Sequence, residues 1–162
     1  MKKIFLVSLP IQSYIMKGMG NSYDYNPSLG LLSLGTYLDW HGYECYLYDM
    51  IFGEKKVSGL LNDIKLKKPF MVCISVYTEN SEFAAKLSRK IKEISYDIKI
   101  CWGGPHVTLD EINESSDYLD FAIHNEGEST LLELIEAVVS DEKIISYDNI
   151  LGLSYYRDNI LY

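Results

Sequence analysis

The sequence FMVCISV at residues 70–76, followed by SEFAAKLSRKIKEI at 81–94 and IKICW at 98–102, decides the fold. The first and last stretches are apolar at successive positions and rich in β-branched or aromatic residues, which is typical of strands buried on both faces of a parallel sheet. Four apolar side chains of the middle stretch recur at three- and four-residue spacings, as in an amphipathic helix. They are Phe83, Leu87, Ile91 and Ile94. Together the three stretches predict a β-α-β unit.

Short apolar runs and helix-length stretches alternate along most of the remaining chain, which is the pattern of repeated β-α-β units. Further strands are expected at residues 3–9, 44–50 and 120–124, and further helices at residues 27–42, 54–66 and 126–139. The sequence therefore predicts an α/β fold in which a five-stranded parallel sheet carries helices on both faces.

The C-terminal stretch ILGLSYYRDNILY, residues 150–162, has a different pattern. Two short β-like runs flank the tripeptide RDN, and this arrangement predicts a β-hairpin. We expect one domain over residues 1–145 and a hairpin over residues 146–162 that leads into a further domain.

Two stretches lack a regular pattern. Residues 10–26 form a 17-residue connection, longer than the usual β–α loop, and loops of that length are commonly functional. Residues 110–116 are expected to form a short helix or turn.

Composition restricts the class of protein. A chain of 162 residues with 48% hydrophobic content suits one globular domain, and its net charge of −8 argues against a nucleic-acid partner. No membrane span and no secretory signal are readable, so we expect a cytoplasmic protein without a membrane partner. Cys45, Cys73 and Cys101 each lie in an apolar run without metal-ligand spacing and are expected to be core thiols.

Ligands of an open parallel sheet bind beyond the carboxyl ends of its strands, which directs attention to the residues that follow each strand. Gly103 and Gly104 follow the fourth strand, where missing Cβ atoms allow either a tight turn or close approach of a ligand. Ser75, Thr78 and Asn80 follow the third strand and offer side chains for ligand contact or helix capping.

The histidines and two glutamates admit structural and functional interpretations. His41 lies at an expected helix end, and His124 ends a strand, whereas His106 follows the glycine pair and is the better ligand candidate. Glu126 and Glu128 are expected in the first turn of a helix, where carboxylates favour the helix dipole and where they could also contact a ligand.

Several familiar ligand motifs are missing from the sequence. A dinucleotide fingerprint fails because Gly18 and Gly20 come late and Tyr23 stands where the third glycine belongs. No phosphate-binding GxxxxGK[ST] occurs, and the third strand ends in Ser75-Val76-Tyr77 instead of the aspartate of a phosphoryl-accepting receiver.

Ser75-Val76-Tyr77, followed after 25 residues by Gly103-Gly104, resembles the SxL…GG pair of cobalamin-binding Rossmann-like domains. Four longer blocks follow one another as in the N-terminal domain of cobalamin-dependent radical SAM proteins, of the methyltransferase and anaerobic magnesium-protoporphyrin IX monomethyl ester cyclase type. They are YNPSLGLLSLGTYLDWHGYE, WGGPHVT, YLDFAIHNEGESTLLELIEAV and ILGLSYYRDN, and they span nearly the whole chain.

The resemblance implies a doubly wound domain of flavodoxin-like strand order with cobalamin at its carboxyl edge. The implied cofactor-binding residues are Ser75, Val76, Tyr77, Thr78, Gly103, Gly104, Pro105, His106, Val107, Glu126, Gly127 and Glu128. The missing Cβ atoms of the glycine pair would admit the dimethylbenzimidazole tail, so Gly104→Ala is expected to weaken binding and leave the cofactor-free fold largely intact.

Two departures from the wider family bear on this site. The DxHxxG motif, which supplies a histidine to cobalt in methionine-synthase-like relatives, is missing, and no histidine precedes His41. We therefore expect no histidine lower ligand from the loop after the first strand. Asn125 stands where this branch usually has glycine, so a cofactor contact at this position is in question.

The resemblance further implies that this chain is the cobalamin-binding module of a radical SAM enzyme. A CxxxCxxC motif for a [4Fe-4S] cluster is lacking, so the cluster, S-adenosylmethionine and catalysis belong to a downstream domain. Two alternatives stay open: an interaction or structural domain that has lost cobalamin binding, and a small independent enzyme that uses His106 and Glu126.

Overall fold

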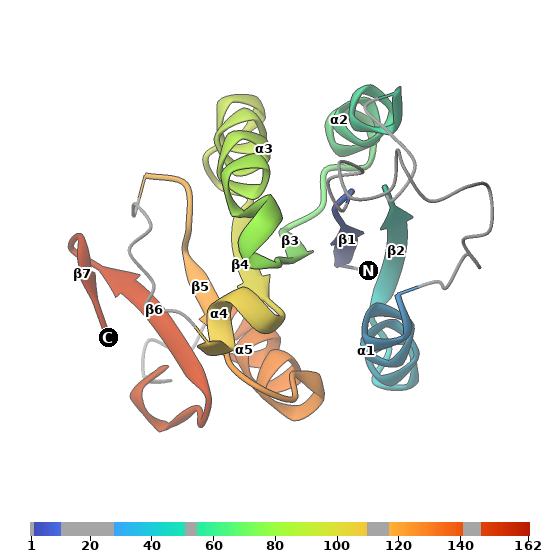
Figure 1. Cartoon of the computed structure of the whole chain (residues 1–162). Helices are drawn as coiled ribbons and strands as arrows, with labels where there is room; N and C mark the ends of the chain where they lie inside the picture. Colours follow the sequence, from blue (N-terminus) through green and yellow to red (C-terminus); the bar gives the residue numbers. More distant parts are fainter. Residues whose placement is uncertain (1, 11–27, 51–54, 110–116, 141–146) are drawn as a thin grey trace, which may run out of the picture.

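The computed structural model describes residues 2–10, 28–50, 55–109, 117–140 and 147–162, and in these ranges the chain builds one seven-stranded sheet (Figure 1). The strands are β1 (Lys3–Ser8), β2 (Glu44–Asp49), β3 (Met71–Ser75), β4 (Lys99–Gly103), β5 (Phe121–Ile123), β6 (Leu153–Arg157) and β7 (Ile160–Leu161). Their order is β2-β1-β3-β4-β5-β6-β7, and β1 to β5 run parallel. The predicted parallel sheet and its flavodoxin-like order are confirmed.

The C-terminal hairpin is also confirmed, but it belongs to the sheet. β6 pairs antiparallel with β5 and β7 with β6, so the hairpin extends the five expected strands to seven. Asp158 and Asn159 between β6 and β7 have φ values of 52° and 63°, as a two-residue type I′ turn requires.

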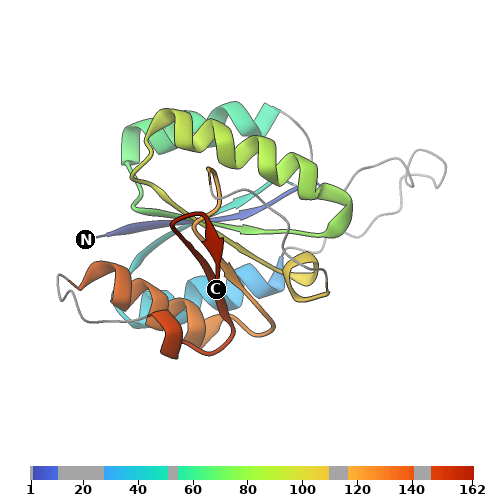
Figure 2. The same cartoon turned by 90° about the vertical axis from the view of Figure 1, so that its left-hand side faces the viewer.

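Helices cover both faces of the sheet (Figure 2). The helices α1 (Leu29–Trp40) and α5 (Glu128–Val139) lie on one face, and α2 (Lys55–Lys67) and α3 (Ser81–Ile94) lie on the other. Short helical turns η2 (Thr78–Asn80), α4 (Pro105–Leu109) and η3 (Tyr147–Asn149) complete the described elements. The α4 helix was not predicted, since its sequence was interpreted as a glycine turn. The stretch 110–116 and the long connection beyond Pro10 lie outside the described residues.

Alternation along the strands divides the core into two layers. Val72 and Ile74 of β3 pack toward α2 and α3, whereas Met71 and Cys73 pack toward α1 and α5. Because side chains alternate along a strand, Ser75 follows Cys73 onto the α1/α5 face. The same rule places Gly103 of β4 on that face after Cys101.

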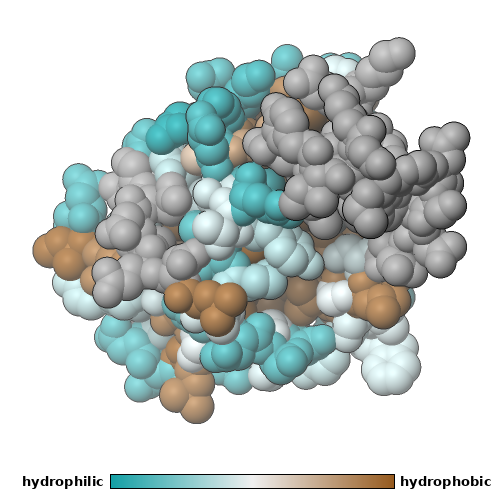
Figure 3. Space-filling model, in the orientation of Figure 1, coloured by the Kyte–Doolittle hydropathy of each residue, from teal (hydrophilic) through white to brown (hydrophobic). Residues whose placement is uncertain are grey.

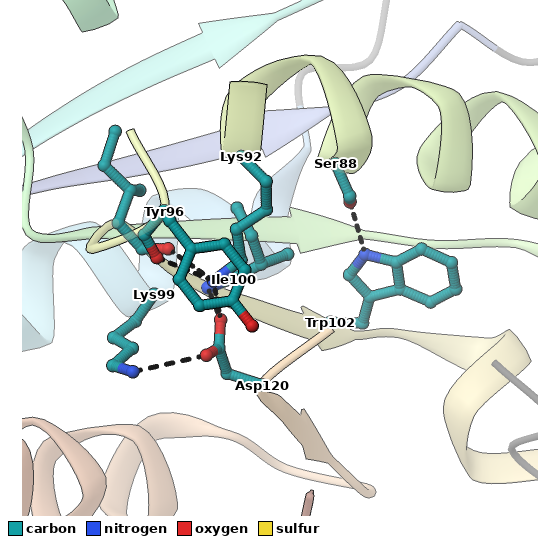
Figure 4. A network of polar contacts seen from close by, with 8 residues as sticks. Ser88, Lys92, Tyr96, Lys99, Ile100, Trp102 and Asp120 are labelled. Atoms are coloured by element: carbon teal, nitrogen blue, oxygen red, sulfur yellow. Dashed lines mark hydrogen bonds and ion pairs between the residues drawn. The ribbon is translucent and has the colours of Figure 1, made fainter. Parts of the chain in front are cut away.

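A charged cluster closes the amino-terminal edge of β4 (Figure 4). Lys92 Nζ on α3 lies 2.6 Å from Asp120 Oδ2, with side chains only 7% and 19% exposed. The same carboxylate oxygen accepts the backbone N–H of Ile100 at 2.8 Å, and Lys92 also donates to the carbonyl oxygen of Ile98. This cluster joins α3, β4 and the start of β5 at the edge opposite the carboxyl ends of the parallel strands.

The cysteines and helices bear on two further sequence predictions. Cys73 and Cys101 are buried and Cys45 is half-buried, and all three are free thiols, as expected for core cysteines. Burial, with smaller contributions from Cys73 and Asp39, raises the pKa of Cys45 to about 12. No helix among the described residues combines the length and apolar character needed to span a membrane.

Candidate functional site

A pocket of about 550 Å³ opens at the carboxyl edge of the parallel strands, on the α1/α5 face. Its lining comes from the ends of β1, β3 and β4, the beginning of α1, and the connection from β5 into α5. Figure 3 shows apolar as well as polar surface on the face seen in Figure 1, where η2 and α4 lie in front of the strands. The site therefore lies where parallel α/β sheets bind ligands.

One rung of the sheet lines this pocket. Ser75 pairs in register with Ser8 of β1 on one side and with Gly103 of β4 on the other, and all three line the pocket. The Ser8 hydroxyl donates a 2.7 Å hydrogen bond to Asp49 Oδ1. The rung thus presents three groups to the pocket: the Ser8 hydroxyl, which is bonded to Asp49, the Ser75 hydroxyl, and the bare backbone of Gly103.

Gly103 and Gly104 lack a Cβ for different reasons. A Cβ on Gly103 would have the Ile123 carbonyl oxygen as its nearest neighbour, at a comfortable 3.8 Å. Gly104 has φ of +98°, and a Cβ there would stand 2.9 Å from the carbonyl oxygen of Val76. The fold itself therefore requires glycine at 104. The expectation that Gly104→Ala would leave the cofactor-free fold intact is wrong.

The backbone holds this turn in place. The N–H of Val76 donates to the Gly103 carbonyl at 2.8 Å, and the N–H of His106 donates to the Val76 carbonyl at 3.1 Å. Val76 and Val107 are buried in the core layer under α2 and α3, so their side chains lie on the far side of the sheet from the pocket.

The remaining predicted residues around β3 and β4 divide into two groups. Tyr77 and Pro105 line the pocket, and the tyrosine is 43% exposed. Thr78 and His106 are outside the described lining and contact each other, with 3.3 Å between Thr78 Oγ1 and His106 Nδ1. Asn80 Oδ1 accepts the Tyr77 N–H at 2.9 Å, so this side chain fixes the turn that follows β3.

The connection from β5 to α5 supplies the opposite wall. Glu126, Gly127 and Glu128 all line the pocket, but α5 begins at Glu128, so Glu126 precedes the helix instead of lying in its first turn. The Ser33 hydroxyl on α1 donates to Glu128 Oε1 at 2.6 Å. This bond links α1 to the start of α5 beside the pocket.

Asn125 replaces a glycine without loss of backbone conformation. Its φ is +59°, in the left-handed region that asparagine tolerates better than most residues, and its N–H donates to Thr108 Oγ1 at 3.0 Å. The departure from glycine at this position is therefore accommodated by the turn.

The interior of the pocket is apolar and was not foreseen from the sequence. The missed lining residues are Ser8, Leu9, Ser28, Leu29, Gly30, Leu31, Leu34, Cys73, Ile74, Trp102, Ile123, Asn125 and Leu131. A period of two would have indicated Cys73, which lies two residues before Ser75 on the same face. Leu9 follows β1, and the other leucines come from helices whose apolar pattern is that of any core helix.

Metal-ligating chemistry is sparse at this edge. A hydrogen bond with Cys101 and burial raise the pKa of Cys73 well above that of an ordinary thiol, so this pocket residue is not a thiolate. All three histidines lie within the described residues, and none of them lines the pocket. His41 Nδ1 contacts the Tyr37 carbonyl oxygen at 2.7 Å, and His124 Nε2 contacts Ser154 Oγ at 3.0 Å. In the described part of the chain, no group of three His, Cys, Asp or Glu side chains could hold a metal ion.

The fold and the pocket define a Rossmann-like domain with its ligand site at the carboxyl edge of a parallel sheet. A family model described as B12 binding domain matches residues 17–135, and the chain belongs to this family.

Two curated relatives extend the comparison. An uncharacterized methyltransferase of Pyrococcus horikoshii is 28% identical over 155 residues, which are 94% of this chain and 32% of that protein. The anaerobic magnesium-protoporphyrin IX monomethyl ester cyclase of Synechocystis is 28% identical over 136 residues, which are 82% of this chain and 27% of that protein. The chain thus spans about a third or less of each relative.

Among solved structures, the cobalamin-dependent S-adenosylmethionine radical enzyme OxsB superposes with a TM-score of 0.70 at 20% identity, over 100% of this chain and 22% of that one. A 3-dehydroquinate dehydratase-like protein from Bifidobacterium longum reaches a TM-score of 0.53 at 12% identity, over 87% of this chain and 100% of that one. At these identities the likenesses show the fold. The family match adds that this fold is that of a B12-binding domain.

Proposed function

We propose that the pocket holds the nucleotide tail of cobalamin and that this chain is the cobalamin-binding module of a radical SAM enzyme. The observation that carries the proposal is the rung of Ser75 and Gly103, which lines a pocket of about 550 Å³. Such a volume is within the range of about 300–1,000 Å³ typical of cofactor sites, and the bare backbone at Gly103 leaves room for a flat group beside the sheet.

The predicted residues take distinct roles in this proposal. The residues that contact the cofactor from the pocket wall are Ser75, Tyr77, Gly103, Gly104, Pro105, Glu126, Gly127 and Glu128. Gly104, Val76 and Val107 hold the turn that shapes the wall, and Thr78 and His106 lie beside its mouth. When bound, cobalamin supplies a carrier for a methyl group or assists radical chemistry. The chain's own residues bind the tail, orient the cofactor and exclude water from the apolar interior.

We further propose that the chain supplies no histidine ligand to the lower face of cobalt. The connection after β1 contains no histidine, and the three histidines of the sequence lie outside the described lining of the pocket.

A downstream domain completes the enzyme in this proposal. The curated relatives are about three times longer than this chain, and such a domain would contribute the [4Fe-4S] cluster, S-adenosylmethionine and either methyl-transfer or oxidative cyclase chemistry. Residues 1–145 would form most of the cobalamin domain, and residues 146–162, whose hairpin extends the same sheet, would lead toward the next one. Leu29, Tyr77 and Leu109 at the carboxyl edge are 74%, 43% and 80% exposed, which suits an edge that another domain covers. Free core thiols favour a cytoplasmic location, and the net charge of −8 disfavours nucleic acid.

Equilibrium dialysis of the 162-residue chain tests the proposal with two compounds, hydroxocobalamin and cobinamide, which has the corrin ring but no nucleotide tail. We expect the chain to retain cobalamin and to bind cobinamide at least tenfold more weakly, a difference of about 1.4 kcal/mol. No retention of cobalamin at a large excess would favour the alternative of an interaction domain that has lost the cofactor. Equal binding of the two compounds would show that the pocket does not bind the nucleotide tail.

A further inference from the structure

The lining of the pocket changes character with depth. Near the mouth, the lining side chains of Tyr77, Asn125 and Glu126 are exposed and carry polar groups. The deeply buried wall includes Leu31, Cys73, Ile123 and Leu131, none of which is more than 5% exposed. The buried wall is therefore mainly apolar, and its polar side-chain groups are the Cys73 thiol, the Ser8 hydroxyl and the indole N–H of Trp102.

The polar atoms of the other buried lining residues are already used. Trp102 is 1% exposed, and its Nε1–H donates to Ser88 Oγ at 3.1 Å on the α3 side of the sheet. The proton of the Ser8 hydroxyl is donated to Asp49 Oδ1. Cys73 is the register partner of Cys101 in the β3–β4 ladder, and its thiol is only a weak hydrogen-bond donor. On the buried wall formed by the described residues, a ligand thus finds no uncommitted hydroxyl or N–H donor. The hydroxyls of Ser28 and Ser75 also line the pocket, but both residues are half-buried and lie outside this wall.

Leu34 of α1 closes this interior toward the β5–α5 connection. It lines the pocket, and its Cδ2 and the Cγ2 of Ile123 both come within 3.5 Å of the place where a Cβ on Gly127 would stand. Leu34 and Ile123 therefore meet at Gly127, and a change at Leu34 alters the chemistry of the interior without touching the sheet.

Cobamides share the corrin ring and differ in the base of the nucleotide tail. The base of cobalamin is a benzimidazole with two methyl groups, whereas adeninylcobamide has a purine with an exocyclic amine and additional ring nitrogens. Each of these polar groups loses its water when the base is buried, and an unpaired buried polar group weakens binding. The two methyl groups instead gain from contact with an apolar wall.

We propose that this pocket selects cobamides by their base, accepting benzimidazoles and other apolar aromatic bases and rejecting purines. The selectivity rests on the proposed function, because it requires the nucleotide tail to occupy the pocket. Leu34, Cys73, Ile123 and Leu131 are its determinants.

Competitive dialysis of the 162-residue chain measures the selectivity with cobalamin, adeninylcobamide and cresolylcobamide, whose base is a methylated phenyl ring. We expect adeninylcobamide to bind at least tenfold more weakly than cobalamin and cresolylcobamide to bind within about threefold of it. Equal or tighter binding of adeninylcobamide overturns the selectivity while leaving the proposed function standing. Weak binding of cresolylcobamide also overturns it, because polarity would then not be the cause. Retention of none of the three compounds defeats the proposed function itself.

Two substitutions on α1 test whether the selectivity comes from the pocket. Leu34→Gln places an amide in the interior and should narrow the preference for cobalamin over adeninylcobamide at least threefold. Leu32→Gln, on the same helix at a residue that is 40% exposed and outside the described lining, should leave the ratio unchanged. Cys73→Ser is a second interior variant with little change in volume and should narrow the ratio in the same direction. If neither Leu34→Gln nor Cys73→Ser changes the ratio of cobalamin to adeninylcobamide affinity, the assignment of the selectivity to this pocket is overturned.

Discussion

Gly103 and Ser75 are partners in the last rung of the β3–β4 ladder, and both lie on the face of the sheet that carries the pocket. The adjacent Gly104 turns at φ +98° over the backbone of Val76. Both glycines line the pocket, but only Gly104 is also required by the fold, so substitutions can separate the two demands.

Gly103→Ala should weaken cobalamin binding without destabilising the protein. Its Cβ has no close neighbour in the fold, and alanine reduces the entropy of the unfolded chain, so the melting temperature should stay the same or rise slightly. The methyl group would stand on the pocket side of β4, and we expect at least tenfold weaker binding in equilibrium dialysis. Gly59→Ala on α2 is the control, since a Cβ there also meets nothing and lies outside the described lining. Normal affinity in Gly103→Ala would show that the tail does not approach this strand.

Gly104→Ala should instead destabilise the cofactor-free protein. Alanine is strained at φ +98°, and its Cβ would press against the Val76 carbonyl oxygen at 2.9 Å. We expect a loss of about 1–3 kcal/mol in the free energy of unfolding, measured by urea titration without cofactor. An unchanged midpoint would mean that the turn relaxes without cost, and the glycine would then be needed for the ligand alone.

The sequence predicted the sheet well because strands buried on both faces are continuous apolar runs. The helix α3 has the predicted bounds, 81–94, since its apolar side chains recur strictly on one side. The five-residue helix α4 was missed because the glycine pair before it was interpreted as a turn continuing through Pro105. Proline at a first helical position was the available signal.

The site was only partly predictable for a physical reason. Ser75 and Gly103 follow strands of a parallel sheet, and topology alone brings strand ends together. Leu31 and Leu131 reach the same pocket from helices 100 residues apart in the sequence, and nothing local distinguishes a leucine that lines a pocket from one that packs in a core. The demand for glycine at 104 likewise depends on Val76, which follows β3 and is distant in the sequence.

Asp120→Ala should unfold more easily than the parent chain while binding cobalamin normally once folded. It removes the carboxylate that pairs with Lys92, whose side chain is 7% exposed, and leaves a buried ammonium group without its counter-charge. Breaking such a pair costs about 3 kcal/mol, and urea titration measures it. The control is Asp117→Ala, because Asp117 and Arg89 form a 3.9 Å pair that is exposed on both sides. That loss should be under about 1 kcal/mol. Similar losses in the two variants would contradict the assignment of the Asp120 cluster as a structural anchor.

Cobalt in the bound cofactor should lack a nitrogen ligand from the protein and from its own tail. A base held in the apolar interior cannot also coordinate cobalt, and the three histidines of the chain lie outside the described lining of the pocket. Two of them are held elsewhere: His41 by the Tyr37 carbonyl and His124 by the Ser154 hydroxyl. The electron paramagnetic resonance spectrum of bound Co(II)-cobalamin should therefore show cobalt hyperfine lines without superhyperfine splitting from an axial nitrogen. His106 lies nearest to the glycine pair in the sequence and is the residue to test. Splitting that is present in the parent chain and lost in His106→Ala would identify His106 as the cobalt ligand. Splitting that persists in His106→Ala would indicate that the base of the cofactor's own tail coordinates cobalt.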